Sequence, residues 1–196
     1  ELRLQQIKDV TDLGMAGELS LRESLDARIK ILDAKQSHLA ELVKRLKKLI
    51  SKSINRNKAF FQENAENTFI VSNGFKDFIV PVVTDLGIKA EHVFANDFVF
   101  DEAGNIVDFN RDNVLSSNGG KVKQIEQLRL QGEIHMIGDG YTDYEVKKAG
   151  VAKKFWAFTE NIERDSVKAN ADHIAPSFDE ILFENNMSGA LSYPKN

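Results

Sequence analysis

The stretch Ile134-His135-Met136-Ile137-Gly138-Asp139-Gly140-Tyr141-Thr142-Asp143 decides the fold of this chain. Its first half is short and apolar, as in a buried strand, and the two glycines then allow a sharp turn into a helix. Asp139 follows the strand directly, and Asp143 lies in the first turn of the helix. Two carboxylates at one strand end repel each other unless a cation lies between them, and Mg²⁺ prefers such oxygen ligands. The alternative is an ordinary turn in which the helix dipole favours Asp143.

The same alternation of strand and helix extends over the C-terminal two thirds of the chain. The pattern predicts strands at 69–71, 155–158 and 173–175, a hairpin over 93–109 with its turn at 103–105, and helices at 74–86, 121–130, 143–149 and 162–170. Strands that alternate with helices form a parallel sheet with right-handed crossovers. The predicted fold class is therefore α/β, and ligands are expected at the carboxyl ends of the strands.

The residues before this part have apolar side chains at helical spacing and no strand pattern. A first helix is expected to end at Gly14, and a capping box of Ser20 and Glu23 starts the next helix. We expect three parts along the chain: a helical domain over 1–66, an α/β core over 67–186, and a tail or linker over 187–196.

The composition excludes several classes of protein. The 196 residues include 42% hydrophobic side chains and thirteen Phe, which excludes a disordered chain. There is no Cys, so neither a disulfide framework nor a thiolate zinc site is available. No apolar run approaches the roughly 20 residues of a membrane span, and the net charge of −4 does not suit a protein that coats nucleic acid. We expect a cytoplasmic protein that binds neither nucleic acid nor membranes.

Two other strand-to-helix junctions carry residues suited to phosphate. Ser72-Asn73-Gly74 offers a hydroxyl and backbone amides to a phosphate oxygen, although such a stretch alone is more often an N-cap or a turn. Ser117-Asn118-Gly119-Gly120-Lys121 leads into a helix that begins with a lysine. The Lys121 ammonium would neutralise phosphate charge, whereas a solvated surface lysine is the default interpretation.

The order of these three motifs resembles the haloacid dehalogenase superfamily of phosphoryl-transfer enzymes, and within it the phosphoserine phosphatase family. Segments 9–20 and 24–28 are similar to that family's helical cap, and the resemblance covers about residues 7–182. It implies a Rossmann-like three-layer core with a parallel sheet plus a small helical cap domain. The implied activity is Mg²⁺-dependent hydrolysis of O-phospho-L-serine to L-serine and phosphate in serine biosynthesis, through an aspartyl-phosphate intermediate.

The resemblance also implies a role for each matched residue. Ser72 would hydrogen-bond the phosphoryl oxygens, and Lys121 would balance their charge. Asp139 would bind Mg²⁺ directly, and the catalytic Asp143 would hold it through water. Arg28 would clamp the substrate carboxylate, although without the family it is an exposed helix residue paired with a carboxylate. The substrate-binding residues implied in this way are Met15, Arg28, Ser72, Asn73, Gly74 and Thr142.

Some of the family pattern is missing or altered. Asn73 stands where the family often has Gly, and Thr142 replaces a common Asn. The family's Asp-x-Asp-x-Ser/Thr run, which carries the nucleophile on the first, central strand, has no counterpart. Asp9 and Asp12 lie in a helical pattern with the wrong spacing. We therefore expect a truncated chain that lacks this strand and is itself inactive on phosphate esters.

Two other functions remain open on this sequence. One is a non-catalytic phosphatase-like module that serves a fused or partner dehydrogenase. The other is a related phosphatase for another small phosphomonoester. A homodimer, or fusion to a 3-phosphoglycerate dehydrogenase domain, is the partner arrangement that the resemblance suggests.

Overall fold

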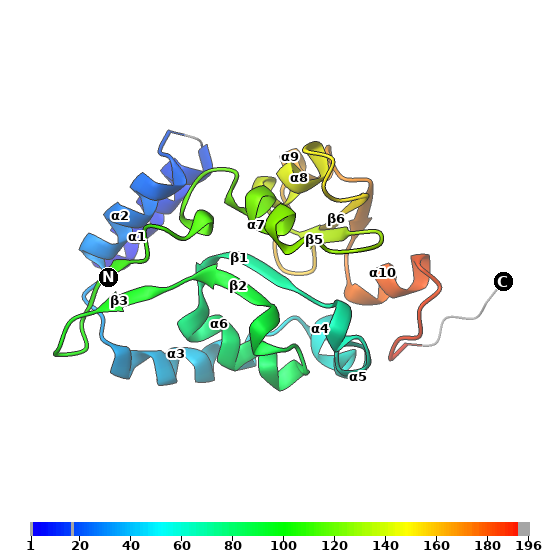
Figure 1. Cartoon of the computed structure of the whole chain (residues 1–196), viewed down its shortest axis with the longest axis horizontal. Coiled ribbons are helices and arrows are strands. Elements are labelled where there is room, and N and C mark those ends of the chain that lie inside the picture. Colours follow the sequence, from blue (N-terminus) through cyan, green and yellow to red (C-terminus); the bar gives the residue numbers. More distant parts are fainter. Residues whose placement is uncertain (1, 17, 192–196) are drawn as a thin grey trace.

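The structure is a computed structural model that describes residues 2–16 and 18–191 (Figure 1). Its α-helices are α1 (Leu2–Ala16), α2 (Leu21–Ile31), α3 (Gln36–Lys48), α4 (Lys52–Arg56), α5 (Lys58–Glu63), α6 (Lys76–Val83), α7 (Gly120–Leu128), α8 (Tyr141–Lys148), α9 (Asp165–Lys168) and α10 (Phe178–Glu184). The strands are β1 (Ile70–Phe75), β2 (Val93–Asn96), β3 (Phe98–Phe100), β4 (Ile106–Phe109), β5 (His135–Gly138), β6 (Lys154–Phe158) and β7 (His173–Ala175). The described 3₁₀ turns are η1 (Ala65–Asn67), η2 (Thr84–Leu86), η3 (Ala90–His92) and η4 (Val114–Ser116). Within the described ranges, no helix combines the length and the apolar character needed to span a bilayer.

The strands form two parallel sheets and one antiparallel hairpin. β1 pairs with β2 in parallel, and β5, β6 and β7 form a parallel sheet in that order. β3 and β4 make the hairpin. Among the described residues, β1 and β5 each have one edge to which no strand is paired.

Helices cover both faces of the parallel sheets. On one face, Ile70 of β1 and Trp156 of β6 share a core with α6 and α10. On the other face, Val71 of β1 and Met136 of β5 pack with α7 and α8. Since neighbouring strand residues point to opposite faces, both sheets lie in one layer between the same two helical layers. Figure 1 shows this order at β1 and β2, which lie between α7 and α6. The predicted α/β class with a three-layer core is confirmed.

Two strand predictions are wrong in their limits. β2 belongs to the parallel sheet with β1 instead of a hairpin over 93–109, because the buried Val93 packs into the shared core. The hairpin is confined to β3 and β4. β1 continues to Phe75, so Ser72-Asn73-Gly74 lies within the strand span, where the pairing register shifts after Val71.

Two helix predictions also need correction. α1 runs through Gly14 to Ala16, because a single glycine lowers helix stability without ending the helix. α9 covers only Asp165–Lys168 instead of 162–170. Its predicted first turn contains Ile162, which is 48% exposed and therefore gains little from packing in a helix.

The N-terminal helices contact different parts of the chain. α2 packs on α1 and on β4, whereas α3 packs on α6 and α4 packs on α10. The division into a helical domain over 1–66 and a core over 67–186 stays a prediction.

A buried polar cluster joins α4 to α10. Asp179 is buried and accepts hydrogen bonds from Arg56 Nε at 2.9 Å and from Asn57 Nδ2 at 2.8 Å. Burial raises the pKa of Asp179, but these hydrogen bonds outweigh that effect and leave the pKa below its usual value. The ionised carboxylate therefore stabilises the contact between these helices.

Substituting Asp179→Ala should lower the free energy of unfolding by about 2 to 3 kcal/mol near pH 7, because Arg56 and Asn57 lose a buried acceptor. The carboxylate contribution is fully present above about pH 4 and is lost as the pH falls through the lowered pKa of Asp179. Urea unfolding of both proteins over a pH series should thus give curves that converge in acid. A difference independent of pH would contradict the assigned ionisation.

Candidate active site

The first part of the candidate site is a buried ion pair between Lys121 and Asp143. Lys121 Nζ lies 2.5 Å from Asp143 Oδ1, and the two side chains are 12% and 7% exposed. Lys121 stands in the first turn of α7 and Asp143 in the first turn of α8. Burying two charges is costly unless they are well paired, so this contact fixes the two helix starts against each other. The structure thus brings together two residues predicted from separate motifs.

The Gly-Asp-Gly turn is shaped around the Asp143 carboxylate. Asp143 Oδ2 accepts a hydrogen bond from the Gly140 amide at 3.1 Å. A Cβ atom at Gly138 would lie only 2.2 Å from Asp143 Cγ. The last residue of β5 must therefore be glycine for Asp143 to reach its position, which explains the first glycine of the motif.

Asp139 lies at the end of β5 with its side chain 48% exposed. Its carboxylate pairs with Arg164, which also donates to the Asp139 backbone oxygen at 2.8 Å. Among the described residues, no three acidic, His or Cys side chains gather closely enough to hold a metal ion. The oxygen donors of Asp139 and Asp143 fit one part of a Mg²⁺ site. A complete site needs further oxygen ligands.

Ser72 is held in an orientation that suits a hydrogen-bond donor to phosphate. Its Oγ accepts a hydrogen bond from the Gly74 amide at 3.0 Å, which leaves the hydroxyl hydrogen free to donate elsewhere. The Asn73 side chain donates to the Leu115 carbonyl at 3.1 Å. This bond connects the Ser72 segment to η4, the turn that precedes Lys121. The Asn73 side chain of one predicted motif is therefore hydrogen-bonded to the turn that precedes the other.

The remaining predicted residues are less directly connected to the Lys121–Asp143 pair. Arg28 is half-buried, and burial lowers the pKa of its guanidinium. Its Nε donates to the Ser24 carbonyl of its own helix, and among the described residues no carboxylate pairs with it. Thr142 is exposed in the first turn of α8. Met15 lies on α1, but its side chain is outside the described residues.

The position of Arg28 on α2 relates it to the Ser72 segment. Leu21 and Leu25 lie seven and three residues before Arg28, so all three share one helix face. Leu25 packs with Phe75, the residue that ends β1. Arg28 thus lies one turn from the contact between α2 and the end of β1. The expectation that Arg28 is an exposed residue paired with a carboxylate does not hold among the described side chains.

Two arginines at the site were missed by the sequence reasoning. Arg164 follows β6, and the rule that parallel strands end at one edge could have placed it near Asp139. Arg22 of α2 donates to the hydroxyls of Ser116 at 3.0 Å and Ser117 at 3.2 Å. No sequence signal marks Arg22, because Ser116 and Ser117 lie 94 and 95 residues away in the chain.

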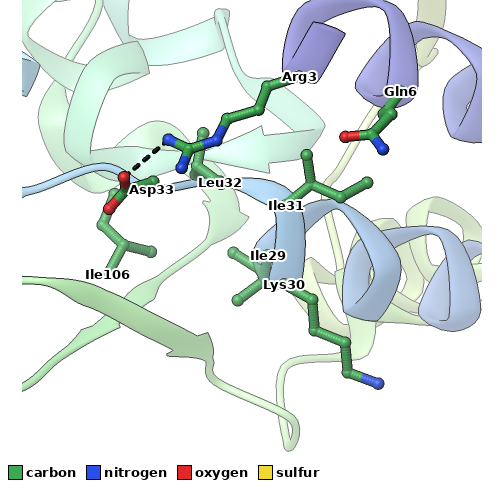
Figure 2. Close-up of a pocket in the computed structure, with 8 residues that line it drawn as sticks. All are labelled: Arg3, Gln6, Ile29, Lys30, Ile31, Leu32, Asp33 and Ile106. Carbon is green, nitrogen blue, oxygen red and sulfur yellow. Dashed lines mark hydrogen bonds and ion pairs between the residues drawn. The ribbon is translucent and has the colours of Figure 1, made fainter.

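A cavity of about 530 Å³ lies elsewhere, between the start of α1 and the end of α2 (Figure 2). Arg3 Nη1 and Asp33 Oδ2 pair across it at 2.7 Å, and both side chains are well exposed. Its lining contains none of the predicted site residues: Arg3, Gln6, Ile29, Lys30, Ile31, Leu32, Asp33 and Ile106. An exposed ion pair contributes little stability, and we assign no role to this cavity.

Comparisons with known proteins place these observations in context. No family model matches the chain. The chloroplastic phosphoserine phosphatase of Arabidopsis thaliana is 31% identical over 179 residues, and the phosphoserine phosphatase of Drosophila melanogaster is 28% identical over 181 residues. Both alignments cover 90% of this chain but only 61% and 66% of the relatives. The chain thus spans less than two thirds of either relative.

A solved structure shows the same arrangement of elements. The phosphoserine phosphohydrolase-like protein from Francisella tularensis subsp. tularensis SCHU S4 matches with a TM-score of 0.80 and 28% identity. The match covers 93% of this chain and 85% of that chain. The predicted resemblance and the fold that it implied are confirmed.

Replacing Gly138 by alanine tests the close packing around Asp143. Gly138→Ala should lower the free energy of unfolding by about 1 to 3 kcal/mol, because its Cβ overlaps the Asp143 carboxylate. Gly140→Ala is the matched control, since its Cβ would lie 3.3 Å from Asp143 Oδ2. The control should cost less than about 1 kcal/mol in urea unfolding. Equal losses in the two variants would show that Gly138 is not constrained by Asp143.

Proposed function

We propose, from the similarity of the chain to phosphoserine phosphatases, that it forms most of the active site of an enzyme that hydrolyses O-phospho-L-serine. The products would be L-serine and phosphate, the last step of serine biosynthesis. The observation that carries the proposal is the buried Lys121–Asp143 pair, whose lysine stands on α7, a helix that contacts β1, the strand that carries Ser72. A fixed cation and a free hydroxyl donor are the groups that the binding of a phosphoryl group requires.

The phosphate group would be bound by Ser72 and Lys121. The Ser72 hydroxyl has its acceptor side occupied by the Gly74 amide, so its hydrogen is available to a phosphoryl oxygen. Lys121 would share its charge between Asp143 and the phosphate. Because both groups are already oriented, little reorganisation accompanies the reaction.

Asp139 and Asp143 would hold a divalent cation, for which we propose Mg²⁺. Their oxygen donors suit this hard ion. When bound, the ion would neutralise charge that develops on the transferring phosphoryl group. Asp139 would exchange its contact with Arg164 for the cation, whereas Asp143 would keep its bond to the Gly140 amide.

The nucleophile is proposed to lie on a strand that is not among the 196 residues. Among the described residues, no strand pairs with one edge of β1, which carries Ser72, or with one edge of β5, which leads into Asp139, and these edges support the idea. A strand between them would place an aspartate beside both residues, because parallel strands end at the same edge. That aspartate would attack phosphorus as the phosphorus–oxygen bond to serine breaks, and the serine oxygen would take up a proton and leave as L-serine. Water would then attack the aspartyl-phosphate, releasing phosphate and restoring the aspartate.

Arg28 is proposed to bind the carboxylate of the substrate. Its burial without a carboxylate partner among the described residues supports this role, since a half-buried guanidinium gains from a bidentate anion. The clamp would distinguish phosphoserine from phosphomonoesters that lack a carboxylate.

Phosphate release from O-phospho-L-serine by the full gene product, with Mg²⁺ and after chelation, tests the activity. Lys121→Ala should lower kcat by roughly 100-fold or more, because one charged contact to the transferring group is lost. Lys123→Ala is the control, since Lys123 is exposed on the same helix. The control should keep its activity. An active Lys121→Ala enzyme, or release unaffected by chelation, would contradict the proposed roles.

The Arg28→Ala variant tests the substrate class. Its kcat/KM for O-phospho-L-serine should fall by roughly 100-fold, while that for O-phosphoethanolamine, which lacks the carboxylate, should change little. Lys30→Ala, on the same helix, should leave both values unchanged. Equal losses of kcat/KM on both substrates would show that Arg28 does not bind the substrate carboxylate. A protein that hydrolyses only other phosphomonoesters would favour the alternative function, a related phosphatase for another small phosphomonoester.

A further inference from the structure

Asn96 is a fully buried polar residue at the end of β2, beside the proposed phosphate site. It is 0% exposed, and it follows the apolar residues Val93-Phe94-Ala95 of its strand. An amide buried to this degree needs hydrogen bonds to offset its lost hydration. The bonds that Asn96 makes therefore indicate why the position is polar.

The Asn96 side chain donates to two carbonyl groups on different segments. Its Nδ2 lies 3.0 Å from the Asn73 oxygen and 3.2 Å from the Leu115 oxygen. The first carbonyl belongs to the segment that carries Ser72, and the second belongs to η4. One side chain thus joins the segment that carries Ser72 to the turn that precedes Lys121.

The bond to Asn73 controls the direction of the neighbouring amide. In a trans peptide the C=O and the following N–H point in opposite directions. Fixing the Asn73 carbonyl therefore fixes the Gly74 N–H, which donates to Ser72 Oγ at 3.0 Å. Through this amide, Asn96 determines how the Ser72 hydroxyl is presented.

The bond to Leu115 controls the approach to Lys121. Gly120 is packed so closely that a Cβ atom there would lie 2.2 Å from the Val114 oxygen and 2.9 Å from Leu115 Cα. A displacement of Leu115 is therefore transmitted to Gly120 and to the adjacent Lys121. Asn96 thus influences the positions of both Ser72 and Lys121, the proposed hydrogen-bond donors to phosphate, without itself contacting a ligand.

Burying the Asn96 side chain also has an energetic cost, which its two hydrogen bonds to carbonyl groups do not explain. Among the described residues, no donor reaches the buried Asn96 Oδ1. A buried acceptor without a partner destabilises the folded state. A residue kept at such a cost is expected where its other contacts serve a function.

We propose that Asn96 is a positioning residue that sets Ser72 and Lys121 at the spacing a phosphate group needs. The inference rests on the proposed function, because it takes Ser72 and Lys121 as the residues that donate hydrogen bonds to the phosphate.

The test compares Asn96→Ala with Asn57→Ala in the full gene product. Asn57 is a matched control, since it is 2% exposed and its Nδ2 also donates to two acceptors, Ser53 O and Asp179 Oδ1. Its Oδ1 additionally accepts from the Ala190 amide at 2.7 Å, so its removal breaks more bonds. Inorganic phosphate is titrated by calorimetry or amide NMR, and stability is measured by urea unfolding.

The two variants should rank in opposite order for loss of stability and for loss of phosphate affinity. Asn57→Ala should lose more stability yet keep the phosphate Kd within about twofold, whereas Asn96→Ala should lose less stability and bind phosphate roughly tenfold more weakly. Asn96→Ser, which retains one donor, should fall between wild type and Asn96→Ala, and it replaces Asn96→Ala if that variant does not fold.

Three outcomes distinguish the possible failures. A wild-type protein that does not bind phosphate would contradict the proposed function itself. Wild-type affinity in the Asn96 variants would overturn the positioning role alone. Affinity that follows stability in all variants, Asn57→Ala included, would reduce Asn96 to a structural residue.

Discussion

The buried ion pair between Lys121 and Asp143 is the contact on which the candidate site depends. Neither charge is stable in a low-dielectric environment without the other. Their pairing fixes the start of α7 against the start of α8, and it requires the glycine at 138 that makes room for the carboxylate. The Leu115 carbonyl, in the turn that precedes Lys121, then accepts hydrogen bonds from Asn73 of β1 and from Asn96, which also donates to the Asn73 carbonyl. The chemistry of the site is thus built into the packing of its supporting elements.

Much of this organisation could be predicted from the sequence, because it follows local rules. The short apolar run before Asp139 and the glycines around it indicate a strand that turns into a helix, and the structure has β5 and α8 there. Alternating strands and helices indicate parallel pairing, which β5, β6 and β7 show. The Ser20–Glu23 capping box also forms at the start of α2. Each of these features depends on residues that are close in the chain.

Features that depend on distant partners could not be predicted in this way. The apolar run of β2 is compatible with a hairpin or a parallel strand, and only its burial against the shared core decides between them. Arg22 and Arg164 are ordinary charged residues until the fold places them beside Ser116 and Asp139. Asn96 gave a weak signal, as a polar residue ending an apolar strand, but its two carbonyl partners come from separate loops.

A crystal structure of the full gene product with O-phospho-L-serine and Mg²⁺ would show directly whether this site binds phosphoserine as proposed. We expect the phosphate within hydrogen-bond distance of Ser72 Oγ and Lys121 Nζ, the cation on Asp139, and the substrate carboxylate on Arg28. We also expect an aspartate from a strand between β1 and β5 in line with phosphorus. Phosphoserine bound away from Ser72 and Lys121, or β1 and β5 paired directly to each other, would contradict the proposed site.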